Sequence, residues 1–295
     1  MSLFSGRLGL ERAQIPHSDR HGLLWLSRGR LSVEDGSLTF SAAQSDLMAE
    51  GSYGIPYQSV SMILLGPGTS VTHDVFRLLA RHGVLLAAIG EGGVKLYTAP
   101  PMGRQRSSVA RRHAELWVDP SSRLDMARKL YVWRFGTVTP HKDIAVLRGI
   151  EGGRVKASYQ AIASKVGIPW RGRRYDRSKP TDADLPNQAI NHAATFIEAA
   201  AEIAVAATGA LPPLGFIHED SSSAFSLDIA DLYRTDVTIP LAFSAAKRVM
   251  EDPSINLERL VRFEAARTFK KRGLIPTMIE RIQELLGVND RSGDT

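Results

Sequence analysis

The pattern of hydrophobic and polar positions changes character about one third of the way along the chain. Before residue 98, short apolar runs alternate with turn residues, as is typical of β-strands. Asp35-Gly36 supplies the positive φ angles that a tight hairpin turn needs. Gly83 marks the end of the one helix in this part, over residues 71–82. The strands expected are 23–26, a hairpin over 30–40, 60–65, 84–89 and 94–97.

Beyond residue 106 the apolar positions recur at helical spacing. Pro100, Pro101 and Gly103 indicate a linker over residues 98–106. The expected helices are 109–117, 122–135, 143–167, 187–209, 240–250, 256–271 and 276–286. The sequence therefore predicts an α+β protein. A small N-terminal β-sheet domain (1–97) precedes a larger all-helical C-terminal domain (107–295).

Composition removes several classes of function. The chain has 295 residues and no cysteine, which excludes disulfides, a thiolate nucleophile and sulfur-ligated zinc. Residues 1–14 lack the apolar centre of an export signal. The apolar stretch 193–217 contains Glu198 and Glu202 and is broken by Pro212-Pro213, so it is too polar to span a bilayer. We expect a soluble cytoplasmic protein.

The net charge of +6 is unevenly placed. Residues 1–100 hold equal numbers of basic and acidic residues, whereas residues 101–179 hold 18 Lys and Arg against 6 Asp and Glu. Such a concentration indicates a polyanionic partner, most often a nucleic acid. A solvated helix surface is the alternative.

The glycine-rich loops 66–70 and 90–93 lack the Gly-Lys-Ser/Thr ending of a phosphate-binding loop, so we interpret both as turns. The segment around Glu151 is less ordinary. Gly149, Gly152 and Gly153 lie inside a helical pattern, where each costs about 1 kcal/mol relative to alanine. They indicate close approach by another backbone, a ligand or a metal-bound phosphate, or else a loose helix junction.

A histidine and two aspartates follow further along. His218 comes after the stiff Pro212-Pro213 turn, and Ser221–Ser223 are placed to begin a helix that carries Asp228 and Asp231 on one face. Two such carboxylates repel each other unless a cation or base lies between them. Glu151, His218, Asp228 and Asp231 together suit Mg²⁺ or Mn²⁺.

The segment 170–175, Trp-Arg-Gly-Arg-Arg-Tyr, places guanidinium groups beside aromatic rings. This composition suits contacts with phosphates and stacking on bases, and it equally suits an exposed basic loop.

Taken in order, these segments resemble the CRISPR-associated integrase, the first-numbered Cas protein of the adaptation module, in its type I-E subfamily. The resembling stretches are 64–73, 147–159, 172–176, 187–188, 215–218 and 228–231, within a likeness that runs from about residue 12 to about residue 286. The resemblance implies that Glu151, His218 and Asp231 bind a divalent metal, Mg²⁺ or Mn²⁺. It makes Asp228 a nearby acidic residue required for activity.

The resemblance also implies a function. Members join the 3′-hydroxyl ends of a captured double-stranded DNA fragment to the leader-proximal CRISPR repeat, and many cut branched DNA. They form homodimers that flank a dimer of a small partner, the second-numbered Cas protein. We expect the N-terminal domain to be the dimerisation domain, because about 100 residues bury a limited core on their own. The basic residues expected to contact DNA phosphates are Arg148, Arg154, Arg171, Arg173, Arg174, Lys247, Arg248, Arg259, Arg262, Arg267, Lys270, Lys271 and Arg272.

Two departures and two alternatives remain open. Glu219-Asp220 follow His218 where relatives often carry a basic residue, and residues 287–295 form no long Pro-rich tail for partner docking. The alternatives are a DNA-binding scaffold without catalysis, and a nuclease acting on RNA or on branched repair DNA.

Overall fold

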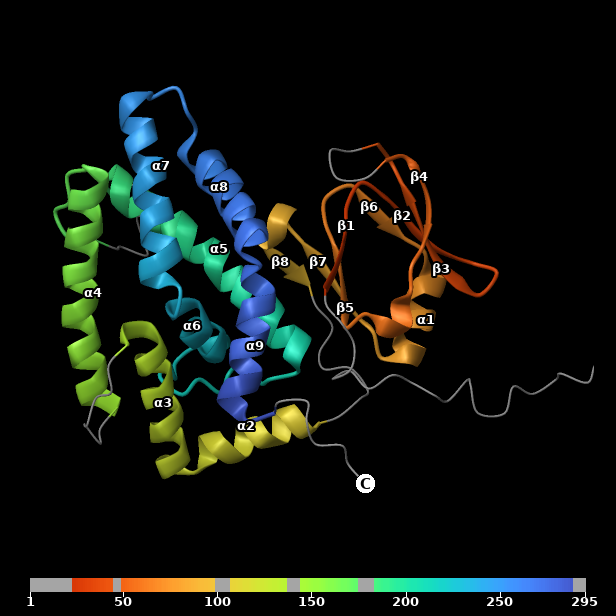
Figure 1. Cartoon of the computed structure of the whole chain (residues 1–295), viewed down its shortest axis with the longest axis horizontal. Helices are drawn as coiled ribbons and strands as arrows, with labels where there is room; N and C mark the ends of the chain where they lie inside the picture. Colours follow the sequence, from red (N-terminus) through yellow and green to blue (C-terminus); the bar gives the residue numbers. More distant parts are fainter. Residues whose placement is uncertain (1–22, 45–48, 99–106, 137–143, 175–182, 289–295) are drawn as a thin grey trace, which may run out of the picture. The chain divides into compact units, whose positions relative to one another are not determined.

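The computed structural model describes residues 23–44, 49–98, 107–136, 144–174 and 183–288, and the side chains of Ile144, Ala145, Leu147, Arg148, Ile150 and Glu151 also lie outside this description. The chain divides into two compact units (Figure 1). A β-sheet unit comes first and a helical unit follows, so the α+β fold class predicted from sequence is confirmed.

The N-terminal part of the chain, residues 23–98, forms two four-stranded sheets. One has the order β1-β5-β7-β8 and the other the order β4-β3-β2-β6. Strand β1 pairs in parallel with β5, as β5 does with β7, whereas β2 and β3 form an antiparallel hairpin. The elements are β1 Leu23–Leu26, β2 Gly29–Glu34, β3 Ser37–Ala42, β4 Gly51–Gly54, β5 Met62–Leu65, β6 Thr69–Val71, α1 His73–His82, β7 Leu85–Ile89 and β8 Leu96–Thr98.

The hairpin turn follows the sequence prediction. Asp35 and Gly36 both adopt positive φ, at 49° and 78°, as a turn that matches the twist of the strands requires. Leu31 and Phe40 lie opposite each other in the ladder and are fully buried. Their side chains join Ile63 and Val75 in one apolar core, which fixes the register of the hairpin.

Three details of this unit differ from the prediction. The turn expected over 66–70 ends in a short strand, β6, which pairs in parallel with β2. Strand β4 was not predicted, because its sequence Gly-Ser-Tyr-Gly has no alternating apolar pattern. Residues 89–97 group with the helical unit, because the turn Glu91–Gly93 packs on helix α8 (Leu257–Arg272). Of the linker expected over residues 98–106, Thr98 is the last residue of β8, and residues 99–106 lie outside the described residues.

The second unit packs its helices around one long central helix, α5 (Leu185–Thr208), as Figure 1 shows. Helix α5 is rich in alanine and contacts α6, α7, α8 and α9, since small side chains let neighbouring helices approach closely. Asp184 caps its first turn and Gly209, with φ of 74°, ends it. The other helices are α2 Ser108–Val118, α3 Pro120–Phe135, α4 Ile144–Val166, α6 Ala224–Asp231, α7 Ile239–Glu251, α8 and α9 Leu274–Leu286.

A five-residue π-helix, Arg234–Thr238, joins α6 to α7 and was not predicted. The backbone N–H of Thr238 donates to the Tyr233 carbonyl five residues back, at 3.0 Å. Such wide turns are rare and occur often at functional sites. This one follows directly on the aspartates of α6.

Helix α4 contains the three glycines that drew attention in the sequence. A Cβ atom placed at Gly149, Gly152 or Gly153 meets no described atom within 4 Å. Packing against the described part of the chain therefore does not explain these glycines. Within the described segments, no helix has the length and apolar character needed to cross a membrane.

Candidate active site

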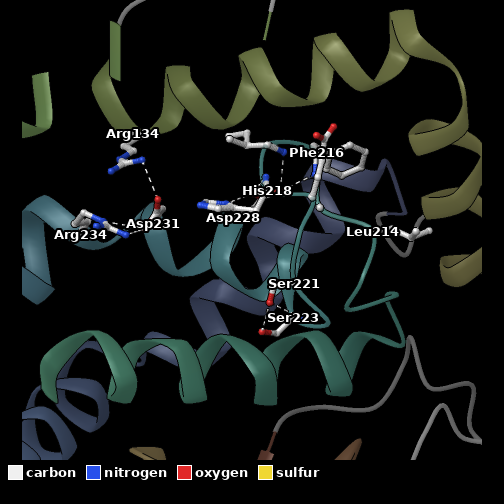
Figure 2. A network of polar contacts seen from close by, with 12 residues as sticks. Arg134, Leu214, Phe216, His218, Ser221, Ser223, Asp228, Asp231 and Arg234 are labelled. Carbon is white, nitrogen blue, oxygen red and sulfur yellow. Dashed lines mark hydrogen bonds and ion pairs between the residues drawn. The ribbon is translucent and has the colours of Figure 1, made fainter. Parts of the chain in front are cut away.

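Three of the residues singled out in the sequence, His218, Asp228 and Asp231, lie on or near the 211–219 loop, which is part of the connection from α5 to α6 (Figure 2). Asp228 of α6 organises this loop from beneath. Its carboxylate accepts three successive backbone N–H groups, from Phe216 at 2.6 Å, Ile217 at 3.0 Å and His218 at 3.0 Å. The side chain of Asp228 is completely buried. Hydrogen bonds to a carboxylate are about twice as strong as neutral ones, so Asp228 fixes the course of the loop.

The same carboxylate orients the ring of His218. Nδ1 of His218 lies 2.7 Å from Oδ1 of Asp228. An imidazole that donates its Nδ1–H to a carboxylate presents Nε2 as its acceptor nitrogen, and this pairing typically supports a metal-ligating histidine. The His218 side chain is 36% exposed, so the ring is supported on one side and reaches solvent on the other.

Helices α2 and α3 hold the opposite side of the loop through its carbonyl groups. His113 Nε2 donates to the Leu214 carbonyl at 2.8 Å, and Trp117 Nε1 donates to the Gly215 carbonyl at 2.9 Å. Arg123 donates to the Phe216 carbonyl at 3.4 Å. Consecutive amide and carbonyl groups of the loop are thus bound from two sides, which leaves the backbone beside His218 little freedom.

His113 is buried and neutral. Burial lowers its pKa to about 4, although its hydrogen bond to the Leu214 carbonyl acts in the opposite direction. Its Nδ1 accepts the N–H of Leu211 at 3.1 Å, so both ring nitrogens are used. The ring also packs on Phe225, with centroids 4.3 Å apart. His113 therefore acts as an internal support of the loop.

Asp231 carries a different set of partners. Oδ2 accepts from Arg134 of α3 at 3.2 Å, and Oδ1 accepts from Arg234 Nε at 2.9 Å and from Arg234 Nη2 (Figure 2). The sequence predicts a cation between the two aspartates of α6. The cations that the structure shows are the two guanidinium groups on Asp231, while Asp228 accepts hydrogen bonds from backbone amides and His218.

One more acid lies nearby. Burial raises the pKa of Glu198 on α5, and its other influences include Arg234, Asp231 and His218. Glu198 was considered in the sequence only as a polar interruption of an apolar stretch. Its side chain belongs to the electrostatic surroundings of the site.

The structure brings His218, Asp228 and Asp231 together but leaves the position of the fourth predicted residue open. Glu151 lies on α4, and its side chain is outside the described residues. Among the described side chains, no group of three or more His, Asp and Glu is arranged to hold a metal ion. The imidazole and carboxylate that are described have the donor chemistry that a hard divalent cation accepts.

Sequence reasoning missed the five side chains that hold the site in place: His113, Trp117, Arg123, Arg134 and Arg234. A signal was present for two of them. Arg123 and Arg134 are eleven residues apart on α3. This spacing is about three helical turns, so both side chains lie on one face of the helix, ~16 Å apart along its axis. Arg123 pairs with Glu219 and Arg134 with Asp231, so part of the basic excess in 101–179 faces acids of the same chain.

Several residues predicted to contact DNA have partners within the chain. Arg173 donates to Asn187 and Asn191 of α5, and Lys247 donates to the Val166 carbonyl. Trp170 stacks on Tyr159, which gives this aromatic ring of the 170–175 segment an internal packing role. Four more of the predicted DNA contacts also have partners within the chain. Three form ion pairs, Arg248 with Glu264, Arg262 with Glu258 and Arg267 with Glu264, and Arg154 lies over the ring of Phe135. Exposed are Arg171, Arg174, Arg259, Lys270, Lys271 and Arg272; the Arg148 side chain lies outside the described residues.

Comparison with known proteins shows which family the sequence resembles. The family model of CRISPR associated protein Cas1 matches residues 134–254. The chain is 35% identical over 277 residues to the CRISPR-associated endonuclease Cas1 of Escherichia coli (strain K12), covering 94% of this chain and 88% of that protein. It is 34% identical to the namesake of Geobacter sulfurreducens, over 92% of this chain and 86% of that protein.

The fold agrees with the sequence comparison. The solved structure of a TtCas1–DNA complex matches with a TM-score of 0.81 and 31% identity, over 92% of this chain and 99% of that one. The class is that of CRISPR-associated endonucleases. The chain belongs to the Cas1 family of endonucleases and integrases.

Proposed function

We propose that this protein is a metal-dependent DNA integrase and endonuclease that inserts captured double-stranded DNA fragments into a CRISPR array, and that it belongs to the type I-E branch. The observation that carries this proposal is the pairing of His218 with Asp228, with Asp231 one helical turn further along α6. A carboxylate-supported imidazole beside a second carboxylate is a fitting half-site for Mg²⁺ or Mn²⁺. Glu151, His218 and Asp231 would hold the metal.

In this proposal Asp228 is a positioning residue. It holds the His218 ring and the loop backbone in one orientation, and Asp231 follows one turn further along α6. The bound metal would polarise the scissile phosphate and stabilise charge on the attacking and leaving oxygens. The 3′-hydroxyl of the fragment loses its proton as its oxygen bonds to phosphorus, and the departing 3′-oxygen of the repeat gains one. One phosphodiester forms as another breaks, so the reaction needs no external energy source.

DNA binding is supported by the exposed basic residues of α8 and of the 170–174 segment. Arg259, Lys270 and Lys271 lie exposed on α8, and across the described chain no acidic side chain is seen paired with them. Such residues bind phosphates without reading base sequence. A homodimer that forms through the N-terminal domain (residues 1–97) and flanks the second-numbered Cas protein completes the proposal.

The test is strand transfer of a labelled short duplex into a plasmid that carries a CRISPR repeat, with and without the second-numbered Cas protein. We expect EDTA to stop the reaction and Mg²⁺ or Mn²⁺ to restore it. Glu151→Ala and His218→Ala should each lower the rate by at least about 10²-fold, because each removes a metal ligand. Glu115→Ala, which removes an exposed carboxylate of α2 paired with Arg112, is the matched control.

Other outcomes would identify the alternatives. DNA binding without strand transfer in any metal would make the protein a scaffold. Faster cleavage of RNA or of branched DNA than of the repeat would make it a nuclease of another pathway. Full activity of a folded His218→Ala variant would remove His218 from the site.

A further inference from the structure

The Asp231 arginine pair, Arg134 and Arg234, consists of two residues in different surroundings. The Arg134 side chain is 3% exposed, whereas that of Arg234 is 34% exposed and that of Asp231 is 12% exposed. Each arginine takes a different oxygen of the carboxylate, Arg134 the Oδ2 atom and Arg234 the Oδ1 atom. Arg234 can therefore leave Asp231 more readily than the buried Arg134 can.

We propose that Arg134 is a positioning residue that holds Asp231 throughout the reaction, whereas Arg234 is an exchangeable cation that leaves Asp231 for a DNA phosphate when the carboxylate takes a divalent metal. This inference rests on the proposed function. It adds a regulatory property to the site, because binding of metal and binding of DNA then strengthen each other.

The position of Arg134 suits a permanent partner. It lies in the last turn of α3, the helix whose first turn binds the 211–219 loop through Arg123. Its guanidinium also lies over the ring of Phe135, 5.1 Å from the centroid. A buried guanidinium on a regular helix cannot reach DNA unless the helix moves. Outer partners that orient a ligating carboxylate typically change metal affinity 10–100-fold when they are removed.

The position of Arg234 suits exchange. It is the first residue of the π-helix, at a point where the backbone departs from the regular α-helical ladder. A guanidinium carries its charge at any ordinary pH, so Arg234 favours an anionic partner. A DNA phosphate is tetrahedral, but its two non-bridging oxygens can accept both donors of a planar guanidinium, as the two oxygens of a carboxylate do.

Charge balance explains why the exchange follows metal binding. Arg134 and Arg234 both contact Asp231, and a divalent cation on the same carboxylate would repel both guanidinium groups. Movement of Arg234 to a phosphate relieves that repulsion. Bound DNA should therefore raise the affinity for metal, and by reciprocity metal should raise the affinity for DNA.

The experiment measures Mn²⁺ binding by electron paramagnetic resonance of free Mn²⁺, with and without a short duplex, for the full chain and its variants. We expect Arg234→Gln to bind Mn²⁺ without DNA on the order of tenfold more tightly than the wild type, and to lose most of the gain that DNA provides. Arg134→Gln should bind Mn²⁺ about 10–100-fold more weakly. If Arg134→Gln does not fold, Arg134→Lys, which keeps the positive charge, is measured in its place.

Two controls separate this inference from the proposed function. Arg128→Gln removes an arginine of α3 that pairs with Asp125 and should leave Mn²⁺ affinity unchanged. His218→Ala should abolish tight Mn²⁺ binding, and if it does not, the metal assignment itself is wrong. If His218→Ala behaves as expected but Arg234→Gln binds Mn²⁺ no more tightly than the wild type, the exchange is wrong. Unchanged affinity in a folded Arg134 variant removes its positioning role.

Discussion

Asp228 and Asp231 lie three residues apart on α6, and their carboxylates accept hydrogen bonds from different kinds of donor. Asp228 is surrounded by backbone N–H groups and one imidazole, whereas Asp231 is held by two arginines. Removal of Asp231 would leave Arg134 as a buried charge without this counterion. Relief of repulsion between the two aspartates is therefore a minor effect, and Asp231→Ala should lower the stability of the protein.

Asp228→Asn should lower both stability and activity. An amide in place of the carboxylate removes the charge and turns one acceptor into a donor that faces the loop N–H groups. We expect the free energy of unfolding to fall by about 2–3 kcal/mol. Asp236→Asn, at an exposed position of the π-helix, is the control. The measurement is urea denaturation followed by circular dichroism, and equal stability of the two variants would contradict the role given to Asp228.

His113 should make the protein lose stability as pH falls from about 6.5 to 4. The pKa of His113 is lowered to about 4 in the folded chain, so in this window the unfolded chain binds a proton that the folded chain does not. The contribution lost is on the order of 3 kcal/mol. Thermal melts across this pH range test it. In His113→Gln, which retains a donor and an acceptor, the pH dependence should be shallower, and an unchanged profile would assign it to other groups.

At the scale of elements, the site is a loop held between two layers of helix. Helices α2 and α3 bind the carbonyls of the 211–219 loop, and α6 binds its N–H groups. Gly215 permits the tight fold of this loop, because a Cβ there would come within 2.3 Å of the His218 carbonyl oxygen. The loop geometry thus depends on elements about 100 residues apart in the chain.

The glycines of α4 should lower the stability of the helix while allowing DNA to approach it. Gly152→Ala and Gly153→Ala meet no described atom, so each should raise the free energy of unfolding by about 0.5–1 kcal/mol. If the open space serves approach of DNA next to Glu151, the same variants should slow strand transfer. Gly215→Ala is the matched opposite case and should destabilise the protein. Alanine variants of α4 that are both more stable and fully active would show that these glycines serve no ligand.

At the scale of the whole molecule, the positive charge should act through a few exposed residues. Each phosphate contact contributes about 0.9 to the slope of log affinity against log salt. Arg259→Glu combined with Lys270→Glu and Lys271→Glu should therefore reduce the slope by up to about 3. Arg77→Glu, at an exposed residue of α1 paired with Asp74, should change it little. Fluorescence anisotropy at several salt concentrations gives the slopes, and an unchanged slope in the triple variant would place DNA elsewhere.

Arg173 requires separate treatment. Its guanidinium binds Asn187 and Asn191, so Arg173→Glu should lower stability as well as DNA affinity.

We expect the chain to form a homodimer through its first unit. About 100 residues bury a limited apolar core on their own, and most homo-oligomers are two-fold dimers. Light scattering at micromolar concentration, without DNA or partner, should give about twice the chain mass of 32.3 kDa. A monomer that still performs strand transfer would mean that DNA or the second-numbered Cas protein imposes the symmetry.

The sequence by itself determined the elements whose signals are local. The hairpin turn at Asp35-Gly36 and the end of α5 at Gly209 depend on backbone preferences of single residues, so they could be predicted. The α+β division could be predicted from apolar periodicity, and the family from ordered motifs. That His218 lies near Asp228 and Asp231 could be predicted in the same way, because their spacing on one loop and one helix is short; their role in the site stays a prediction.

Tertiary structure alone decided what each of these side chains binds. The partners of Asp231 come from α3 and the π-helix, and those of the loop carbonyls before His218 come from α2 and α3. No local pattern states that Arg134 will face Asp231 rather than DNA. The same holds for Arg173 and Lys247, which appear in the sequence as free basic residues and in the fold as donors to α5 and to the end of α4. Charge and periodicity are read along the chain, whereas burial and pairing depend on which helices meet. The physical reason is that a guanidinium takes whichever anion the packing brings within hydrogen-bonding distance.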